Sequence, residues 1–332
     1  MADLAQHTIK KITITPVETH FGAPGKTRIV GRNSKSENYG EHQREWLLQA
    51  TTNSGLTGLS NARPAMNRGS MEGLCNDFQD LIGRSLSDFF AVSGGRVSDI
   101  NPRWADVIDR YGFLDVALFD LIGQALGRPA HSLLGDTVRG EVEGYDSSLY
   151  FQDLVNPAEG ANAVAIEAAE AVEKGWRALK LKLGRPGKWF EPNAGTRRDI
   201  EVVESVRATV GDDIKILVDA NNGYDGRLDL LEDFVRGIGD LNVYWMEEMM
   251  TEEIPGYRKL NEWRDKYTPN TLIVDGESYK GRDTIYWQLM EQGLLDAIQP
   301  DMLHMGFWQY HRLAQKIEDS GYDTLIAPHN YN

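Results

Sequence analysis

The sequence predicts an α/β protein, a TIM-type barrel that follows an N-terminal α+β unit. From about residue 140 onward, strand-like runs alternate with helical runs, which indicates repeated βα units and parallel strands. Seven such strands can be recognised, and polar residues gather at their C-terminal ends, which fits a barrel better than an open sheet. Roughly the first 130 residues instead show strands first and helices afterwards, the order typical of an α+β unit.

The N-terminal unit is predicted to begin with a strand over residues 9–22, where β-branched residues are frequent and alternate with polar ones. The polar segment at residues 22–43 that follows is either a solvated loop or a mobile flap that selects substrate. Residues 44–60 are typical of a hairpin with its turn at residues 53–55. Helical periodicity then covers two stretches, residues 71–82 and 102–127.

The barrel strands are predicted from seven short runs, which are VEGYDSS, ALKLKLG, IKILVDA, VYWMEE, TLIVDGE, DAIQPD and TLIAPH. Helical patterns separate them, at residues 157–175, 195–210, 227–238, 255–266, 282–292 and 307–320. After the second strand, the polar strand ends recur about every 24 to 30 residues, which is the usual size of one βα unit.

The second strand, residues 178–184, has lysine at both of its polar positions. Side chains alternate along a strand, so Lys180 and Lys182 point to one face and the leucines between them to the other. Two adjacent ammonium groups on the inner face of a strand repel each other and are costly to desolvate. Either anions lie opposite them or one lysine loses its proton, so we expect this strand at the centre of an active site.

Carboxylates at three successive strand ends predict a metal site. Asp219, Glu247 and Glu277 should converge at the C-terminal rim of the barrel and repel one another unless a cation neutralises them. Oxygen ligands of this kind suit Mg²⁺, so we assign these three residues as its ligands. Glu248 alternates to the other face from Glu247 and is not expected to be a ligand. Asp275 shares a face with Glu277 and is the main alternative to it.

Composition excludes several classes of protein. The chain has 332 residues, 41% of them hydrophobic and 26% charged, so it can bury a large core. Its net charge of −15 disfavours a nucleic-acid partner and an anionic membrane surface. The single cysteine, Cys75, rules out an intrachain disulfide and a cysteine zinc cluster. With neither an apolar N-terminal signal core nor a membrane-spanning window, a cytoplasmic location is expected.

The runs LKLKLG, VDANNG, WMEE, VDGES, QPDMLHMG and APHN, in this order and spacing, resemble the enolase superfamily, mandelate racemase subgroup. The resemblance implies a (β/α)7β-like barrel with an N-terminal α+β capping domain, which we place at residues 136–332 and 1–135. The sequence ends at Asn332, where the resemblance calls for a further helix, an eighth strand and a tail. We therefore expect the barrel to be cut short after strand 7. The resemblance also implies a homo-oligomer.

The resemblance gives roles to the polar residues at the strand ends. Asp219, Glu247 and Glu277 match the positions of metal ligands. Lys182 matches the base on one face of the substrate, and Lys180 matches a partner that lies near the substrate carboxylate and lowers the basicity of Lys182. Asp301 and His329 match a dyad that acts on the opposite face. Asn221 matches a position near metal and substrate. Arg185, directly after the lysine strand, either reaches a distal substrate group or lies on the surface.

These matches imply an enzyme that uses Mg²⁺ to remove the proton α to a carboxylate. The first hypothesis is an acid-sugar dehydratase of carbohydrate acid catabolism that forms a 2-keto-3-deoxy acid. The second is a racemase or epimerase of a 2-hydroxy acid, in which Lys182 and His329 serve opposite faces of one carbon. The third is a catalytically inactive relative with a binding or structural role, motivated by where the sequence ends.

Overall fold

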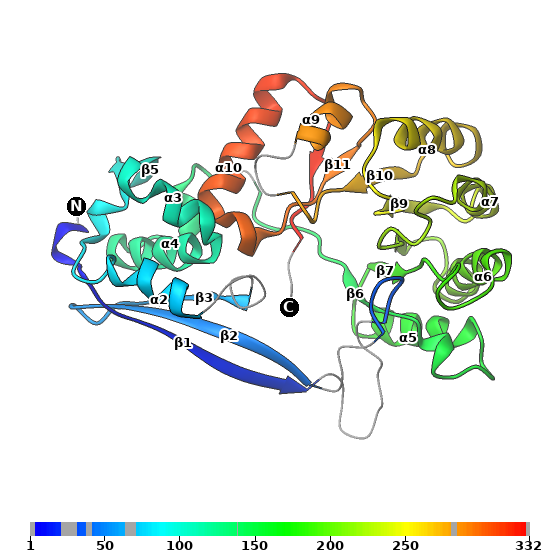
Figure 1. The fold of residues 1–332 in the computed structure, drawn as a ribbon, viewed down its shortest axis with the longest axis horizontal. Coiled ribbons are helices and arrows are strands. Elements are labelled where there is room, and N and C mark those ends of the chain that lie inside the picture. The colour runs from blue at the N-terminus through cyan, green and yellow to red at the C-terminus, as the bar shows by residue number, and fades with distance from the viewer. Residues whose placement is uncertain are drawn as a thin grey trace.

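The computed structural model describes residues 4–20, 32–37, 42–63, 71–137, 139–279 and 284–329. Figure 1 shows an N-terminal sheet with helices beside it, and a second, larger group of strands enclosed by helices. Most of the polar segment predicted at residues 22–43 lies outside the described residues, and only residues 32–37 of it are described. In the described part of the chain, no helix combines the length and the apolar character that crossing a membrane requires.

The N-terminal part contains a three-stranded antiparallel sheet in the order β1-β2-β3. Its strands are β1 (Ile9–His20), β2 (His42–Thr52) and β3 (Thr57–Asn61). The predicted turn at residues 53–55 joins β2 to β3, and Gly55 adopts the left-handed conformation there with φ +87°. The helices of this part are α2 (Met71–Gln79), α3 (Pro102–Arg110) and α4 (Gly112–Leu126).

Two features of the N-terminal part differ from the sequence prediction. The single helix expected over residues 102–127 is two helices, α3 and α4, which meet at Tyr111. A short hairpin of β4 (Phe90–Ser93) and β5 (Arg96–Ile100) was not predicted. Its turn residues Gly94 and Gly95 both have positive φ, and a Gly-Gly pair between two apolar runs is a hairpin signal.

The larger part is a seven-stranded parallel sheet in which sequence neighbours are also spatial neighbours, with β6 and β12 at its two edges. Its strands are β6 (Asp146–Leu149), β7 (Ala178–Lys182), β8 (Lys215–Asp219), β9 (Val243–Glu247), β10 (Leu272–Asp275), β11 (Ala297–Ile298) and β12 (Leu325–Ile326). The intervening helices are α5 (Asn162–Glu173), α6 (Pro192–Val210), α7 (Leu228–Gly237), α8 (Ile254–Tyr267), α9 (Thr284–Glu291) and α10 (Met302–Ser320). Figure 1 shows α5 to α8 along the outside of the strands, which confirms the predicted βα units and the TIM-type fold.

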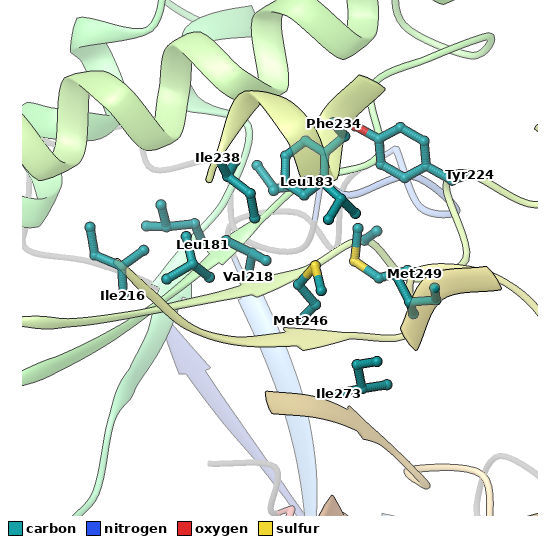
Figure 2. Close-up of a cluster of buried hydrophobic side chains, with 14 of the residues drawn as sticks. Leu181, Leu183, Ile216, Val218, Tyr224, Phe234, Ile238, Met246, Met249 and Ile273 are labelled. Atoms are coloured by element: carbon teal, nitrogen blue, oxygen red, sulfur yellow. The ribbon is translucent and has the colours of Figure 1, made fainter. Parts of the chain in front are cut away.

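Strand alternation sends one set of apolar side chains of this sheet outward, against the surrounding helices. In Figure 2, Leu181 of β7, Val218 of β8 and Met246 of β9 lie in one buried cluster with Phe234 and Ile238, at the C-terminal end of α7. Burying a leucine of this kind contributes about 1.5–3 kcal/mol. The residues between them along each strand must therefore point to the other face, into the barrel.

The inside of the barrel is apolar at its N-terminal end. A separate small core cluster fills it with one residue from each of five strands, which are Ala178, Leu217, Trp245, Val274 and Ala297. Residues two positions further along three of these strands are Lys180, Asp219 and Glu247. The barrel interior is therefore apolar near the N-terminal ends of its strands and contains buried charged side chains near their C-terminal ends.

Helix α10 joins the two parts of the molecule. It packs on α4, and Figure 1 shows it between the N-terminal helices and the strands. The helix is kinked at Gly306, whose φ is +75°. After the kink, the Trp308 backbone N–H donates to the Asp115 carboxyl of α4 at 2.7 Å. Burial raises the pKa of Asp115 to about 7.

Candidate active site

The carboxylates of Asp219, Glu247 and Glu277 form one cluster. One oxygen from each residue lies within 4.8 Å of the oxygens from the other two. Asp219 and Glu247 end the neighbouring strands β8 and β9 and are paired in register, and Glu277 lies two residues beyond β10. The structure therefore brings together the three residues that the sequence placed at successive strand ends.

Asp275, which we had considered as the alternative to Glu277, is held elsewhere. Its carboxyl is completely buried, accepts a hydrogen bond from the Tyr257 hydroxyl, and also accepts the Gly276 N–H at 2.6 Å. Burial raises its pKa well above the ordinary value. Asp275 thus supports the turn that carries Glu277 and does not belong to the three-residue cluster.

The two lysines of β7 face this cluster from inside the barrel. Lys180 is 1% exposed, and its Nζ lies 2.7 Å from Glu247 Oε1 and 3.2 Å from Asp219 Oδ2. The Lys182 ammonium group contacts Asp219 Oδ2, to which it donates a hydrogen bond. The anions expected opposite the lysine pair are therefore the cluster carboxylates.

The pKa of Lys182 differs from the expectation. We expected Lys180 to lower it, and burial and Lys180 do act in that direction. Asp219, together with the other cluster carboxylates, outweighs both effects, so the pKa of Lys182 lies above its ordinary value. Lys182 is a charged counter-ion here, and it can become a neutral base only when another positive charge compensates Asp219.

His329 reaches the cluster from the other end of the sheet. It follows β12, the edge strand furthest from β6 and β7. Its Nε2 lies 3.0 Å from Glu277 Oε1, and its Nδ1 lies 3.4 Å from Asp301 Oδ2. Burial lowers the pKa of His329, but the hydrogen bonds with Asp301 and Glu277 outweigh it and raise that pKa to about 9. One ring nitrogen thus faces Asp301 and the other faces the carboxylate cluster.

Two neutral side chains for which the sequence did not predict a role in the site hold Glu247. The Trp245 indole Nε1 donates to Glu247 Oε2 at 3.1 Å. The Gln299 amide nitrogen, in the orientation that satisfies its hydrogen bonds, lies 3.1 Å and 3.2 Å from the two Glu247 oxygens. The signal for Trp245 was its position two residues before Glu247, on the same face of the strand.

Asn221 lies beside the cluster, where it bonds a fourth acid. Its backbone N–H donates to Asp219 Oδ1 at 2.9 Å, and its side-chain Nδ2 donates to Glu248 Oε2 at 2.8 Å. Strand alternation predicted that Glu248 is not a metal ligand, and it is not one of the three cluster carboxylates. It lies beside Asn221 because it follows the last residue of β9 and has φ +43°, so the strand pattern no longer sets its direction.

Arg185 requires a correction, because it reaches no substrate space and does not lie on the surface. Its guanidinium is fully buried and lies 2.7 Å from Asp153 Oδ1 and 2.7 Å from Asp199 Oδ1. It also donates to the backbone carbonyl of Lys182 at 3.3 Å. Arg185 therefore holds the end of the lysine strand in place, and substrate binding is not its role.

Residues 163–332 match the family model described as enolase C-terminal domain-like. Among curated proteins, D-galactarolactone cycloisomerase of Agrobacterium fabrum is 29% identical over 255 residues, which are 75% of this chain and 61% of that protein. Further curated relatives, 24–30% identical, are acid-sugar dehydratases, a racemase of N-succinyl-arginine and -lysine, and a dipeptide epimerase. The matches span only 36–54% of the lengths of these relatives.

Two crystal structures resemble the whole chain. Galacturonate dehydratase from Geobacillus sp., in complex with D-galacturonate and 5-keto-4-deoxy-D-galacturonate, has a TM-score of 0.78 at 29% identity. The alignment covers 98% of this chain and 80% of that one. A mandelate racemase/muconate lactonizing protein from Geobacillus sp. Y412MC10, in complex with magnesium and tartrate, has a TM-score of 0.79 at 30% identity. That alignment covers 98% and 79% of the two chains.

Proposed function

This chain belongs to the enolase superfamily, and from that premise we propose that it removes the proton α to the carboxylate of an acid sugar and dehydrates the sugar to a 2-keto-3-deoxy acid. The observation that carries the proposal is the meeting of lysines and imidazole at one carboxylate cluster. Glu277 Oε1 lies 3.7 Å from Lys180 Nζ and 3.0 Å from His329 Nε2. Groups that can bind an acid and move protons therefore face one point from both ends of the sheet.

The cluster has the chemistry of a magnesium site. Its donors are three carboxylate oxygens from Asp219, Glu247 and Glu277, the hard oxygen ligands that Mg²⁺ prefers. Burial raises the pKa of Glu247, which reflects the cost of holding these negative charges together out of water. When bound, Mg²⁺ would neutralise the carboxylates and stabilise negative charge on the substrate carboxylate.

The residues around the cluster have different roles in the proposed reaction. Lys180, buried and charged, binds and orients the substrate carboxylate. Either Lys182 or His329 takes the proton from C2. The C3–O bond then breaks, and the other of these two residues, or His329 itself, protonates the departing hydroxyl to give water. The resulting enol tautomerises to the 2-keto acid. Asp301 holds the imidazole of His329 through Nδ1, so that Nε2 stays directed at the substrate.

A second candidate function is racemisation or epimerisation of a 2-hydroxy acid. The observation in its favour is that Lys182 on β7 and His329 after β12 approach the cluster from opposite ends of the sheet. Such an arrangement supplies a proton acceptor and a proton donor on opposite faces of one carbon. The same side chains would serve dehydration, so only the product that forms distinguishes dehydration from racemisation or epimerisation.

The proposal is tested by incubating the protein with Mg²⁺ and a library of mono- and diacid sugars and assaying for 2-keto acids. We expect a 2-keto-3-deoxy product from at least one sugar acid. If no keto acid forms but deuterium from solvent enters C2 with inversion, the protein is a racemase or epimerase. If the protein binds Mg²⁺ and an acid sugar but neither reaction occurs, both enzymatic assignments are wrong.

A further inference from the structure

A cluster of buried charges lies directly behind the C-terminal end of the lysine strand β7. Arg185 is fully buried, and its guanidinium forms a bidentate pair with Asp153, with Nε 3.1 Å from Oδ2 and Nη2 2.7 Å from Oδ1. On the other side, Nη1 donates to Asp199 Oδ1 at 2.7 Å and to the Lys182 carbonyl at 3.3 Å. The guanidinium also lies over the Phe151 ring, 4.0 Å from its centroid. Each nitrogen of the guanidinium thus has an acceptor within the protein.

The same cluster fixes the backbone that leaves β7. Asp199 Oδ2 accepts the N–H of Gly184 at 2.9 Å and the N–H of Arg185 at 3.2 Å. The N–H of Leu183 donates to the Asp219 carbonyl at 2.8 Å. Three consecutive backbone N–H groups after the strand are therefore held by hydrogen bonds.

The turn at residue 184 requires glycine. The φ of Gly184 is +91°, and a Cβ at this position would lie 2.5 Å from the Ala220 carbonyl oxygen. The turn brings the Arg185 side chain back to the carbonyl of Lys182, three residues earlier. The local sequence therefore places a buried cation against the main chain of a residue that we propose for proton transfer.

We infer that Arg185 is a positioning residue for proton transfer, which holds the main chain of Lys182 so that the ammonium group of this lysine stays at the carboxylate cluster. The inference rests on the proposed function, in which Lys182 exchanges a proton with C2 of the substrate. Arg185 acts through Lys182, because its own guanidinium is fully buried and is paired with Asp153 and Asp199.

Stability alone is a weak explanation for this buried cluster. Taking a cation and two carboxylates out of water is costly, and well-packed apolar side chains in their place are often as stabilising. Geometry is a stronger explanation, because a displacement of about 1 Å in a reacting group can slow an enzymatic reaction about a hundredfold. Lys182 is the last residue of β7, so strand pairing ends where its position matters most.

The test compares the wild type with Arg185→Lys. Lysine keeps a positive charge between the two aspartates, but its single ammonium group lacks the planar fork of donors that pairs with Asp153 and also reaches the carbonyl of Lys182. Exchange of the C2 proton of an acid sugar is followed by NMR in D₂O with Mg²⁺. We expect kcat for exchange to fall about tenfold or more, and KM to stay within about twofold because Arg185 does not contact the substrate.

The face of the substrate gives a readout that a general loss of structure would not change. Sugar acids that are epimers at C2, such as D-gluconate and D-mannonate, present the C2 proton on opposite faces. The epimer that depends on Lys182 is the one whose exchange is abolished by Lys182→Ala. Arg185→Lys should slow exchange of that epimer, whereas exchange of an epimer that depends on His329 should stay within about twofold of the wild type.

Arg207→Lys is the matched control. Arg207 is another buried arginine, 8% exposed, and it donates to the backbone carbonyls of Leu241 at 3.0 Å and Ile214 at 2.8 Å. These carbonyls precede β9 and β8, at the opposite ends of the strands from the carboxylate cluster. Arg207→Lys should therefore lower stability and leave kcat for exchange of both epimers unchanged.

Asp199→Asn keeps the inference testable if Arg185→Lys does not fold. The amide keeps the shape of the side chain and an acceptor for the Gly184 N–H, but it cannot pair with the guanidinium as a carboxylate does. It should slow exchange of the same epimer as Arg185→Lys. Wild-type exchange of that epimer in either folded variant, or equal slowing of both epimers, would overturn the inference. So would a Lys182→Ala protein that exchanges every epimer at the wild-type rate.

A crystal structure of Arg185→Lys separates this inference from the proposed function, because it requires no reaction. Lys182 Nζ should be displaced from Asp219 Oδ2, which it contacts in the wild type. If Lys182 is displaced but the wild type exchanges no C2 proton, the positioning of Lys182 by Arg185 stands and the proposed reaction fails. If the wild type exchanges the C2 proton and Arg185→Lys alters neither the rate nor the position of Lys182, the proposed reaction stands and the inference fails.

Discussion

The Glu247 side chain shows at the scale of one residue how the site is organised. Its Oε1 accepts from Lys180 at 2.7 Å, and its Oε2 accepts from the Trp245 indole at 3.1 Å. It is completely buried, so its direction is set by these partners rather than by solvent. A carboxylate held in this way is preorganised to act as a metal ligand.

Glu247→Gln should therefore weaken Mg²⁺ binding by tenfold or more, which corresponds to about 1.4 kcal/mol, because the amide keeps the shape but loses the charge. Isothermal calorimetry on the folded variant measures this. Glu291→Gln, which changes one exposed charge on α9, is the matched control and should bind Mg²⁺ like the wild type. An unchanged Mg²⁺ affinity in Glu247→Gln would remove Glu247 from the ligand set.

The site residues differ in how far the sequence could predict them. Lys182, Asp219 and Glu247 lie together because each is the last residue of its strand, and the ends of parallel strands meet at one rim. Arg185 could not be assigned in this way. Its partners Asp153 and Asp199 come from other elements, and only the folded chain brings those carboxylates to both sides of the guanidinium.

At the scale of elements, the contact between α4 and α10 is the feature that the sequence pattern concealed. Amphipathic periodicity continues through residues 102–127, yet the helix breaks at Tyr111. A Cβ on Gly112 would lie 2.5 Å from the Gly306 backbone nitrogen, so the start of α4 is pressed against the kink of α10. Such a tertiary contact leaves little trace in local periodicity, whereas the parallel strands, with apolar and polar faces set by alternation, were predictable.

Asp115 makes this contact sensitive to pH. Its pKa is raised by burial to about 7 from an ordinary value of 3.8, and nearby Asp109 acts in the same direction. The folded protein thus keeps a proton on Asp115 that the unfolded chain has released, so this residue favours folding below pH 4 and that contribution is lost as pH rises to 7. The loss between pH 5 and pH 8 is about 3 kcal/mol.

Asp115→Asn cannot ionise, but it can still accept from Trp308. Relative to the wild type, its free energy of unfolding should rise by about 3 kcal/mol between pH 5 and pH 8. Urea denaturation of both proteins at the two pH values measures the difference, and pH effects from other groups cancel in the comparison. A difference that stays the same at both pH values would show that Asp115 is ionised in the folded protein.

At the scale of the whole molecule, the order of the sheet makes the proposed chemistry possible. β7 lies near one edge and β12 forms the other, with four strands between them. Lys180 and His329 nevertheless approach the same oxygen of Glu277, because the sheet is curved. The family resemblance implied that these residues serve one site, but neither it nor the βα repeat indicated that α10 and residues 32–37 would link the N-terminal part to the barrel.

The most direct test of the central claim is proton NMR of an acid sugar in D₂O with Mg²⁺ and the protein. The C2 proton signal should disappear with the wild-type protein, whether or not a keto acid accumulates. Lys182→Ala or His329→Asn should abolish exchange in at least one direction while leaving Mg²⁺ binding intact. If Mg²⁺ and the acid sugar both bind to the wild-type protein and the C2 proton remains in place, the lysines and the imidazole do not act on an α-proton and the account is wrong.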